Sequence, residues 1–162
     1  MLIRNLMVLL TLSLFAQTSH AARGGAYFGL VEFDRIPKDT ISLGAFYEVP
    51  TGGQLSVGIQ GEYWKVNLGG DSQVRDLSFA GYGKFYIPTG TAFTPFLQGG
   101  LGLHLLKQSN GNYSDSDHEI GLDLALGTLM RLSSVSLGFS YQVRNVDRWD
   151  YSQIQVSVSQ YL

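Results

Sequence analysis

Hydrophobic and polar residues alternate along most of the chain after residue 22. In the segment 96–106, FLQGGLGLHLL, leucines take positions 97, 101, 103 and 105, whereas Gln98, Gly100, Gly102 and His104 take the positions between them. Side chains of a β-strand point alternately to its two faces, so one face of this segment is apolar and the other is small and polar. The pattern predicts an extended strand with two unlike faces.

The same alternation predicts eight strands. Once the N-terminal segment is set aside, no stretch keeps a helical period over three turns. Each predicted strand is close to the length of a tilted membrane-spanning strand, about 9–11 residues. The strands are expected at residues 26–33, 41–49, 54–66, 76–87, 94–106, 119–131, 135–144 and 151–162.

The connections between these strands alternate in kind. Three are tight and contain turn residues, at 49–53, 87–91 and 132–134, and two of them share the sequence Pro-Thr-Gly. The other four, at 34–40, 67–75, 107–118 and 145–150, are mostly longer and polar. Short turns at one rim and longer loops at the other are typical of outer-membrane barrels.

The two faces differ strongly when all the strands are compared. One face collects Leu, Ile, Val, Phe and Tyr, and in the first strand it includes Tyr27, Val31 and Phe33. The other face combines Gly and Ser with several aromatic residues and with seven charged residues: Glu32, Glu48, Glu62, Lys84, Asp123, Arg131 and Arg144.

The glycines decide which face points inward. A water-facing sheet surface does not need so many of them, because Gly weakens a strand. The interior of a narrow closed barrel needs glycines, because large side chains there require small residues opposite them. The large inner residues are Phe46, Trp64, Tyr82 and Phe96. We therefore predict an all-β fold, an eight-stranded antiparallel up-and-down transmembrane β-barrel whose apolar face contacts lipid and whose charged residues form a polar core in the lumen.

The N-terminus has the features of a secretory signal peptide. Arg4 precedes an apolar run at residues 6–15, and Ser19-His20-Ala21 is a small-residue cleavage pattern. We expect residues 1–21 to be removed and residues 22–162 to form one barrel domain. The chain has no cysteine, so no disulfide stabilises it, and its net charge of −2 offers no basic surface for nucleic acid.

Two segments carry a resemblance to a known family. The runs YGKFYIPTGTAFTPFLQGGLGLHL and EIGLDLALGTLMRLSSVSLGFSYQVR resemble the small outer-membrane β-barrel family that includes opacity-type proteins and the transmembrane domain of OmpA-like proteins. The resemblance implies eight antiparallel strands, both termini at the periplasmic rim and loops that face outward. It also implies the outer membrane of a Gram-negative bacterium, reached by export through the periplasm.

The expected partners follow from this location. They are outer-membrane lipid and lipopolysaccharide, together with the barrel-assembly machinery during biogenesis; we expect a monomer without a cofactor. Proteins of the family commonly end in an aromatic residue, whereas this chain ends Gln160-Tyr161-Leu162. Gln160 interrupts the apolar row formed by Ile154, Val156 and Val158, and a β-bulge is one way to restore the phase of the last strand.

Catalysis is the first chemical hypothesis to consider. The lipid A deacylase family resembles this chain in size, and such an enzyme would require a His-x-Ser pair on the next-to-last strand. That strand reads VSLGFSYQVRNV here and has no histidine. His104 and His118 lie elsewhere without a recurring serine arrangement, and a nucleophile without a positioned base is inert. The sequence therefore predicts that the protein is not an enzyme.

A loop cation site is the second hypothesis. Asp115, Asp117 and Glu119, beside His118 in SDSDHE, offer oxygen ligands that would suit a hard cation such as calcium. The spacing lacks the glycine and the distal glutamate of an EF-hand loop. A solvated acidic loop is the preferred interpretation, so no metal site is predicted, and a loop cation site is the alternative.

Three functions are compatible with the sequence. The preferred one is an integral outer-membrane barrel with a plugged lumen and a structural or surface-interaction role through its outer loops. The alternatives are a small, low-conductance porin-like channel and a soluble periplasmic carrier of an apolar ligand with a lipocalin-like fold.

One pair of residues can be placed by counting. If Ser133 and Ser134 form a two-residue hairpin turn, Leu132 faces Val135, and Asp123 then lies directly opposite Arg144. Both would point to the polar face, about 5 Å apart at Cβ, which predicts an ion pair.

Overall fold

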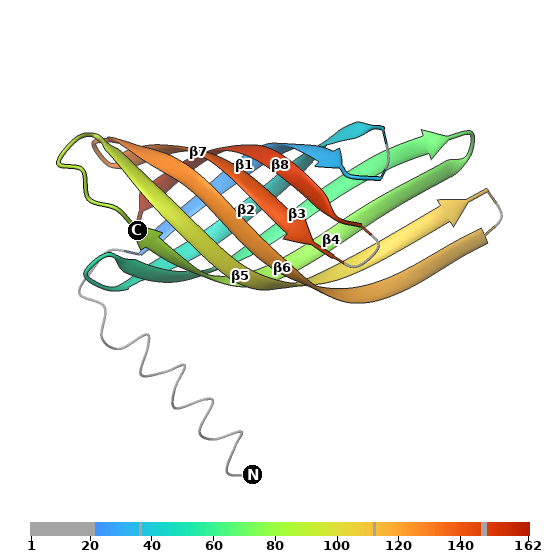
Figure 1. The fold of residues 1–162 in the computed structure, drawn as a ribbon, viewed down its shortest axis with the longest axis horizontal. Coiled ribbons are helices and arrows are strands. Elements are labelled where there is room, and N and C mark those ends of the chain that lie inside the picture. Colours follow the sequence, from blue (N-terminus) through green and yellow to red (C-terminus); the bar gives the residue numbers. More distant parts are fainter. Residues whose placement is uncertain (1–21, 36, 112, 147–148) are drawn as a thin grey trace, which may run out of the picture.

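The eight predicted strands form a closed antiparallel barrel in the computed structural model, which describes residues 22–35, 37–111, 113–146 and 149–162. The predicted signal peptide at residues 1–21 lies outside the described residues. Each strand pairs with the next, and β1 closes the barrel against β8 (Figure 1). The strands are β1 (Arg23–Phe33), β2 (Asp39–Gly52), β3 (Leu55–Gly69), β4 (Ser72–Tyr86), β5 (Phe93–Asn110), β6 (Tyr113–Leu132), β7 (Val135–Asn145) and β8 (Tyr151–Tyr161).

The two ends of the barrel differ. The C-terminus and the start of β1 lie at one end, here called the termini end, together with the β2–β3, β4–β5 and β6–β7 turns (Figure 1). At the other end, the hairpin end, the β3–β4 and β5–β6 hairpins reach well beyond the other two connections. Within the described residues, no helix combines the length and the apolar character needed to cross a membrane.

The two long hairpins correct a prediction. Residues 67–75 and 107–118 were expected to be loops, but β3 pairs with β4 as far as Gly69 and Ser72, and β5 pairs with β6 as far as Asn110 and Tyr113. The segments are mostly polar because they extend beyond the apolar belt, and they pair nevertheless because strand pairing needs only backbone hydrogen bonds. Gly70 and Gly111, with φ of 56° and 53°, reverse the chain at the two tips.

The predicted β6–β7 turn is confirmed. Leu132 pairs with Val135, so Ser133 and Ser134 form a two-residue connection. Ser133 has a φ of 58°, a left-handed conformation that such tight hairpins require and that a non-glycine residue adopts at some energetic disadvantage.

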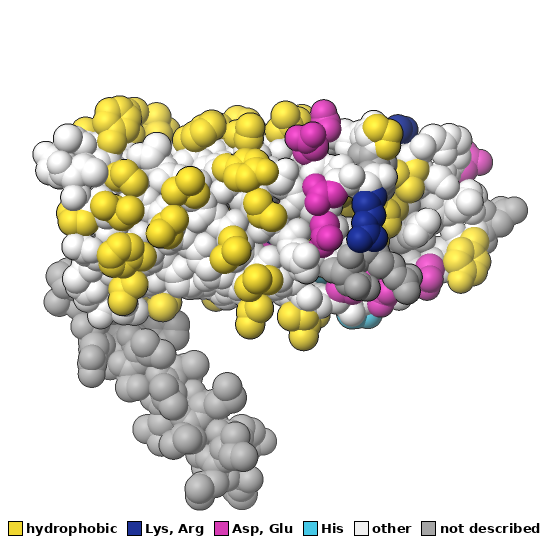
Figure 2. Space-filling model, in the orientation of Figure 1, with side chains coloured by type: hydrophobic (Ala, Val, Ile, Leu, Met, Phe, Trp, Pro, Cys, Tyr) yellow, Lys and Arg dark blue, Asp and Glu magenta, His cyan; other side chains and the backbone are white. Residues whose placement is uncertain are grey.

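The apolar face of β2 to β7 points outward, as predicted. Leu101, in the middle of β5, is 63% exposed, and Ile120 on β6 is 77% exposed. Figure 2 shows apolar side chains spread over the part of the visible surface nearest the termini end, whereas charged side chains gather towards the hairpin end. A surface of this kind matches the hydrocarbon core of a membrane bordered by a polar zone.

The face predicted for β1 is wrong. Tyr27, Val31 and Phe33 are buried inside the barrel, while Phe28 and Leu30 are exposed. Both faces of this strand carry large apolar residues, so alternation alone could not choose between them. Packing chooses between the two faces. A Cβ added to Gly44, the cross-strand partner of Tyr27, would lie 2.2 Å from the Tyr27 ring, so the glycine leaves the space that the ring fills.

The last strand forms as predicted and needs no bulge. β8 keeps an unbroken register with β1 from Tyr151 to Tyr161, so it contains no bulge. Gln160 is exposed on the outer face in line with Ile154 and Val158. Gln160 lies near the end of β8, at the polar edge of the apolar belt. Its amide can therefore face outward there, and no bulge is needed to turn it inward.

Candidate functional site

The barrel interior begins, at the termini end, with a cluster of charges around Glu48. Arg23 donates from Nη2 to both carboxylate oxygens of Glu48 at 2.9 Å. Lys84 Nζ lies 3.0 Å from Oε2, and Ser56 donates to Oε1 at 2.9 Å. Tyr86 Oη also donates to Oε1 at 2.5 Å. All of Glu48's hydrogen-bonding capacity is therefore directed at neighbouring side chains of the barrel.

Aromatic rings enclose this cluster. The Lys84 ammonium lies 4.6 Å from the ring centroid of Phe96 and 5.1 Å from that of Tyr82, which are cation–π distances. Glycines make room for both rings: a Cβ on Gly58 would lie 2.4 Å from Tyr82, and one on Gly127 would lie 2.5 Å from Phe96. The glycines and aromatics of the predicted inner face therefore fit one another across neighbouring strands.

A second cluster occupies the middle of the barrel. Arg144 donates from Nη1 and Nη2 to the two oxygens of Glu62, at 2.8 and 3.2 Å. Its Nε lies 3.2 Å from Oδ1 of Asp123, the cross-strand partner expected from the Ser133-Ser134 turn. Tyr151 Oη accepts from Arg144 at 2.7 Å, and Gln153 donates to Glu62 at 3.1 Å. One guanidinium thus bridges carboxylates from β3 and β6.

His104 and Asp76 form a third buried contact. His104 Nδ1 is 2.7 Å from Oδ2 of Asp76, and both residues are completely buried. Asp76 is not among the seven charged residues predicted for the lumen. Asp76 occupies an inward-facing position of β4, as Ser78 and Lys84 do. The alternation of side chains along this strand was therefore enough to predict its burial.

Two of the seven charged residues assigned to the lumen lie elsewhere. Glu32 is exposed on the outer face of β1, because the phase of that strand is the reverse of the predicted one. Arg131 is exposed near the end of β6, where the barrel opens at the β6–β7 turn. The other five, Glu48, Glu62, Lys84, Asp123 and Arg144, are buried inside.

An apolar cluster lies inside the barrel towards the hairpin end. Trp64 packs edge to face against both Phe33 and Tyr151, and the Phe33 and Trp64 ring centroids are 4.9 Å apart. This cluster, here called the apolar cap, was not predicted from the sequence, because two of its members were assigned to the outer face of β1. The buried members are Val31, Phe33, Trp64, Val66, Val74, Leu106, Val146 and Tyr151.

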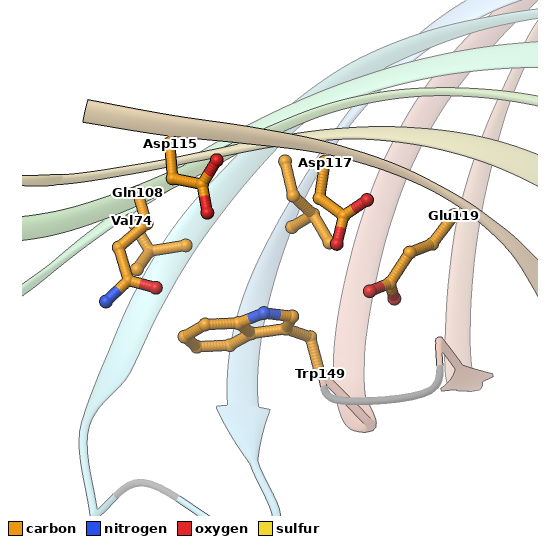
Figure 3. Close-up of a pocket in the computed structure, with 7 residues that line it drawn as sticks. Val74, Gln108, Asp115, Asp117, Glu119 and Trp149 are labelled. Atoms are coloured by element: carbon orange, nitrogen blue, oxygen red, sulfur yellow. The ribbon is translucent and has the colours of Figure 1, made fainter.

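Above the cap, the inner face of the β5–β6 hairpin carries acidic residues (Figure 3). Asp115, Asp117 and Glu119 alternate along β6 and share one side of a cavity of about 140 Å³ with the Trp149 indole. Successive residues on one strand face are about 7 Å apart, too far for one cation to bind all three. Among the described residues, no group of three or more His, Cys, Asp or Glu side chains could hold a metal ion, so the candidate loop cation site is not formed.

Comparison with known proteins identifies the class through the fold. No model of a known protein family matches the sequence, and no curated protein matches it. Solved structures do match. Neisserial surface protein A shares 13% identity over 87% of this chain and 96% of its own, with a TM-score of 0.73. The attachment invasion locus protein Ail of Yersinia pestis shares 14% identity over 88% and 97%, with a TM-score of 0.62.

A third match is the N-terminal β-barrel domain of Pseudomonas aeruginosa OprF, with 10% identity over 88% of this chain and 98% of that one and a TM-score of 0.63. The chain therefore has the fold of the small eight-stranded outer-membrane β-barrels. The resemblance that the sequence suggested is confirmed at this level.

The same fold also occurs in a protein described as the outer-membrane enzyme PagL, which shares 15% identity over 86% of this chain and 99% of its own, with a TM-score of 0.56. The fold by itself is therefore compatible with catalytic and non-catalytic proteins, and the choice between them depends on the side chains.

Proposed function

We propose that this protein is an integral outer-membrane barrel with a sealed interior, and that it acts through the surface of its hairpin end. The observation that carries the proposal is the filling of the lumen. The cavity enclosed by Arg23, Tyr82, Lys84, Phe96 and their neighbours measures only about 30 Å³, about the volume of one water molecule.

A filled interior argues against the porin-like alternative. Conduction needs a continuous hydrated path, whereas here the Glu48 cluster, the Arg144 bridge and the apolar cap follow one another along the barrel axis. Each charge in the two clusters has a partner of opposite sign, so moving one aside to open a path would leave its partner buried without compensation.

Planar-bilayer recording on refolded protein tests the sealed interior. We expect no stepwise conductance above the baseline of the bilayer. A matched variant, Phe33→Ala with Trp64→Ala, removes apolar bulk from the cap but leaves both charge clusters in place, and it should remain closed. Regular single-channel steps from the unchanged protein would overturn the proposal in favour of the channel.

The side chains also favour a role other than catalysis. The only histidine within the lumen of the described chain, His104, is completely buried beside Asp76, and the apolar cap separates it from the hairpin end. A substrate could not reach this pair without removing the cap. We infer that the pair stabilises the barrel and holds β4 against β5.

The soluble-carrier alternative conflicts with the distribution of apolar surface. A carrier would bury its apolar face around an apolar cavity, but here leucines, isoleucines and phenylalanines of β2 to β7 face outward. Detergent-dependent extraction with the outer-membrane fraction supports the membrane assignment; recovery in the soluble periplasmic fraction contradicts it.

The hairpin end provides the surface for interaction. The β5–β6 hairpin extends beyond the barrel and presents three carboxylates beside the Trp149 indole (Figure 3). An acidic, aromatic surface of this kind suits cationic partners. A structurally similar barrel, Ail, is described as an attachment invasion locus protein, which shows that this fold can carry a role in attachment.

A further inference from the structure

Three cationic side chains form a row on the outer surface of β3, β4 and β5, near the hairpin end. Lys65 is the cross-strand partner of Arg75, and Arg75 is the partner of Lys107. All three occupy the outward positions of their strands, and Lys65 and Arg75 are exposed. Directly opposed residues have Cβ atoms about 5 Å apart, so three positive charges lie within about 10 Å.

The chain itself does not neutralise this row. Like charges directly opposite one another destabilise a sheet. Among the described residues, no carboxylate forms a salt bridge with Lys65, Arg75 or Lys107. Lys38 adds a fourth positive charge nearby, since its Nζ donates to the backbone carbonyl of Asn67 at 2.8 Å. Such an arrangement is stabilised when an external anion binds.

An apolar surface lies directly beneath the row. One step towards the middle of the membrane-facing belt, Tyr63 pairs with Leu77, and Leu77 pairs with Leu105. Arg75 and Lys107 edge a groove of about 480 Å³ that these three residues also line. Asp117 borders the same groove, but its carboxylate lies on the inner face of the hairpin (Figure 3).

The row of paired cations does not continue around the barrel. On the β1–β2 side, the outward residues at a comparable position are Glu32 and its partner Asp39, both exposed. A band of cations around the whole barrel would suggest a general attraction to any anionic surface. A short basic row that ends beside an acidic pair on the next strands points instead to an anion bound at a defined place.

We propose that Lys65, Arg75 and Lys107 bind the phosphate groups of an outer-leaflet glycolipid of the lipid A type, whose acyl chains lie along Tyr63, Leu77 and Leu105. Arg and Lys pair strongly with phosphate oxygens, and the adjoining apolar groove suits the acyl chains of the same molecule. A free phosphate would use the cations and leave the groove empty. This inference rests on the proposed function, with the hairpin end at the outer leaflet.

The test is a binding titration on the refolded full barrel in nanodiscs of zwitterionic lipid, with EDTA present and bound lipid counted by native mass spectrometry. The probes are bisphosphoryl lipid A, fully dephosphorylated lipid A, phosphatidylglycerol and inorganic phosphate. We expect bisphosphoryl lipid A to bind best. The triple variant K65Q/R75Q/K107Q should weaken its binding by at least about tenfold, as loss of charge-assisted hydrogen bonds predicts.

Arg131→Gln is the matched control, because it removes an exposed cation at the opposite end of the barrel. It should leave binding unchanged. Equal binding of phosphorylated and dephosphorylated lipid A by the unchanged protein overturns the proposal without reference to any variant. Equal affinity for phosphatidylglycerol or inorganic phosphate overturns the assignment to a glycolipid.

Insertion is measured separately on the same samples, by membrane flotation and by the heat-dependent shift in electrophoretic mobility. A protein that inserts but shows no preference for bisphosphoryl lipid A contradicts this inference and leaves the proposed function intact. A protein that does not insert contradicts the proposed function itself.

Discussion

Arg144 joins carboxylates from two walls of the barrel. It donates two hydrogen bonds to Glu62 on β3, and its Nε lies against Asp123 on the neighbouring strand β6. All three side chains are buried, so their charges are separated from water. Removing one partner of a buried ion pair destabilises far more than replacing the whole pair, because the remaining charge has no compensation.

We therefore expect Arg144→Gln to lower the free energy of unfolding by about 3–5 kcal/mol. Adding Glu62→Gln to it should restore part of the loss, because the amides can hydrogen-bond without net charge. The measurement is a double-mutant cycle on urea unfolding in lipid. A second cycle with Asp123→Asn compares the two carboxylates, and the bidentate contact predicts stronger coupling for Glu62. Coupling energies near zero in both cycles would contradict the bridge.

The glycines of the inner face are matched to particular rings. A Cβ on Gly58 would lie 2.4 Å from the Tyr82 ring and 2.7 Å from the backbone oxygen of Tyr47, so the backbone would have to move. We expect Gly58→Ala to destabilise the barrel by about 1–3 kcal/mol, as overpacking does. Gly81→Ala is the control, since a Cβ there meets nothing within 4 Å. Equal unfolding midpoints for the two variants would show that the ring does not need this glycine.

At the scale of the strand, depth in the membrane sets the effect of a charge. Leu101 lies in the middle of β5 on the outer face, whereas Leu132 is exposed beside the β6–β7 turn. Leu101→Arg should therefore destabilise the folded barrel by about 2–4 kcal/mol, and Leu132→Arg by about 1 kcal/mol or less. Refolding yield into bilayers and urea midpoints provide the readout. A harmless arginine at 101 would mean that this face does not contact lipid.

The neighbouring position shows why structure changes such a prediction. From the sequence, Gly102→Ser would be a well-tolerated control, since position 102 faces the polar interior. A Cβ there would lie 3.2 Å from His104 Nε2 and 3.3 Å from the Ala80 side chain. Leu132 is the better control, because it too is an exposed leucine on the outer face but lies at the end of its strand.

For the whole molecule, the predicted orientation in the membrane rests on the position of the termini, which the family resemblance assigns to the periplasm. Both the start of β1 and the C-terminus are at the termini end, and the long hairpins are at the other (Figure 1). With the termini in the periplasm, the β5–β6 hairpin reaches the outside. The chain has no cysteine, so single cysteines can report on each end without background.

We expect a membrane-impermeant maleimide added to intact cells to label Ser114→Cys and to spare Thr89→Cys, in the β4–β5 turn. Both residues are exposed, so a difference in labelling on intact cells reports which side of the membrane each of them faces. Lysed cells should label both variants, which controls for reactivity. Labelling of Thr89→Cys alone on intact cells would reverse the topology.

The sequence by itself determined the properties that depend on neighbouring residues. Alternation predicted the eight strands and the outward face of β2 to β7, because the direction of a side chain follows from its position along its own strand. The two-residue turn at Ser133 placed Asp123 opposite Arg144, because register propagates from a tight turn.

The tertiary structure decided everything that depends on barrel closure. β1 is apolar on both faces, so only its fit against Gly44 turned Tyr27 inward and Glu32 outward. The long hairpins were predicted as loops, because their residues are mostly polar. Without an apolar residue at every second position, the sequence shows no alternation from which a strand could be predicted. Glu62 and Arg144 are 82 residues apart and meet across the lumen. No local pattern encodes a contact between strands that are not neighbours, because it depends on the curvature of the closed sheet.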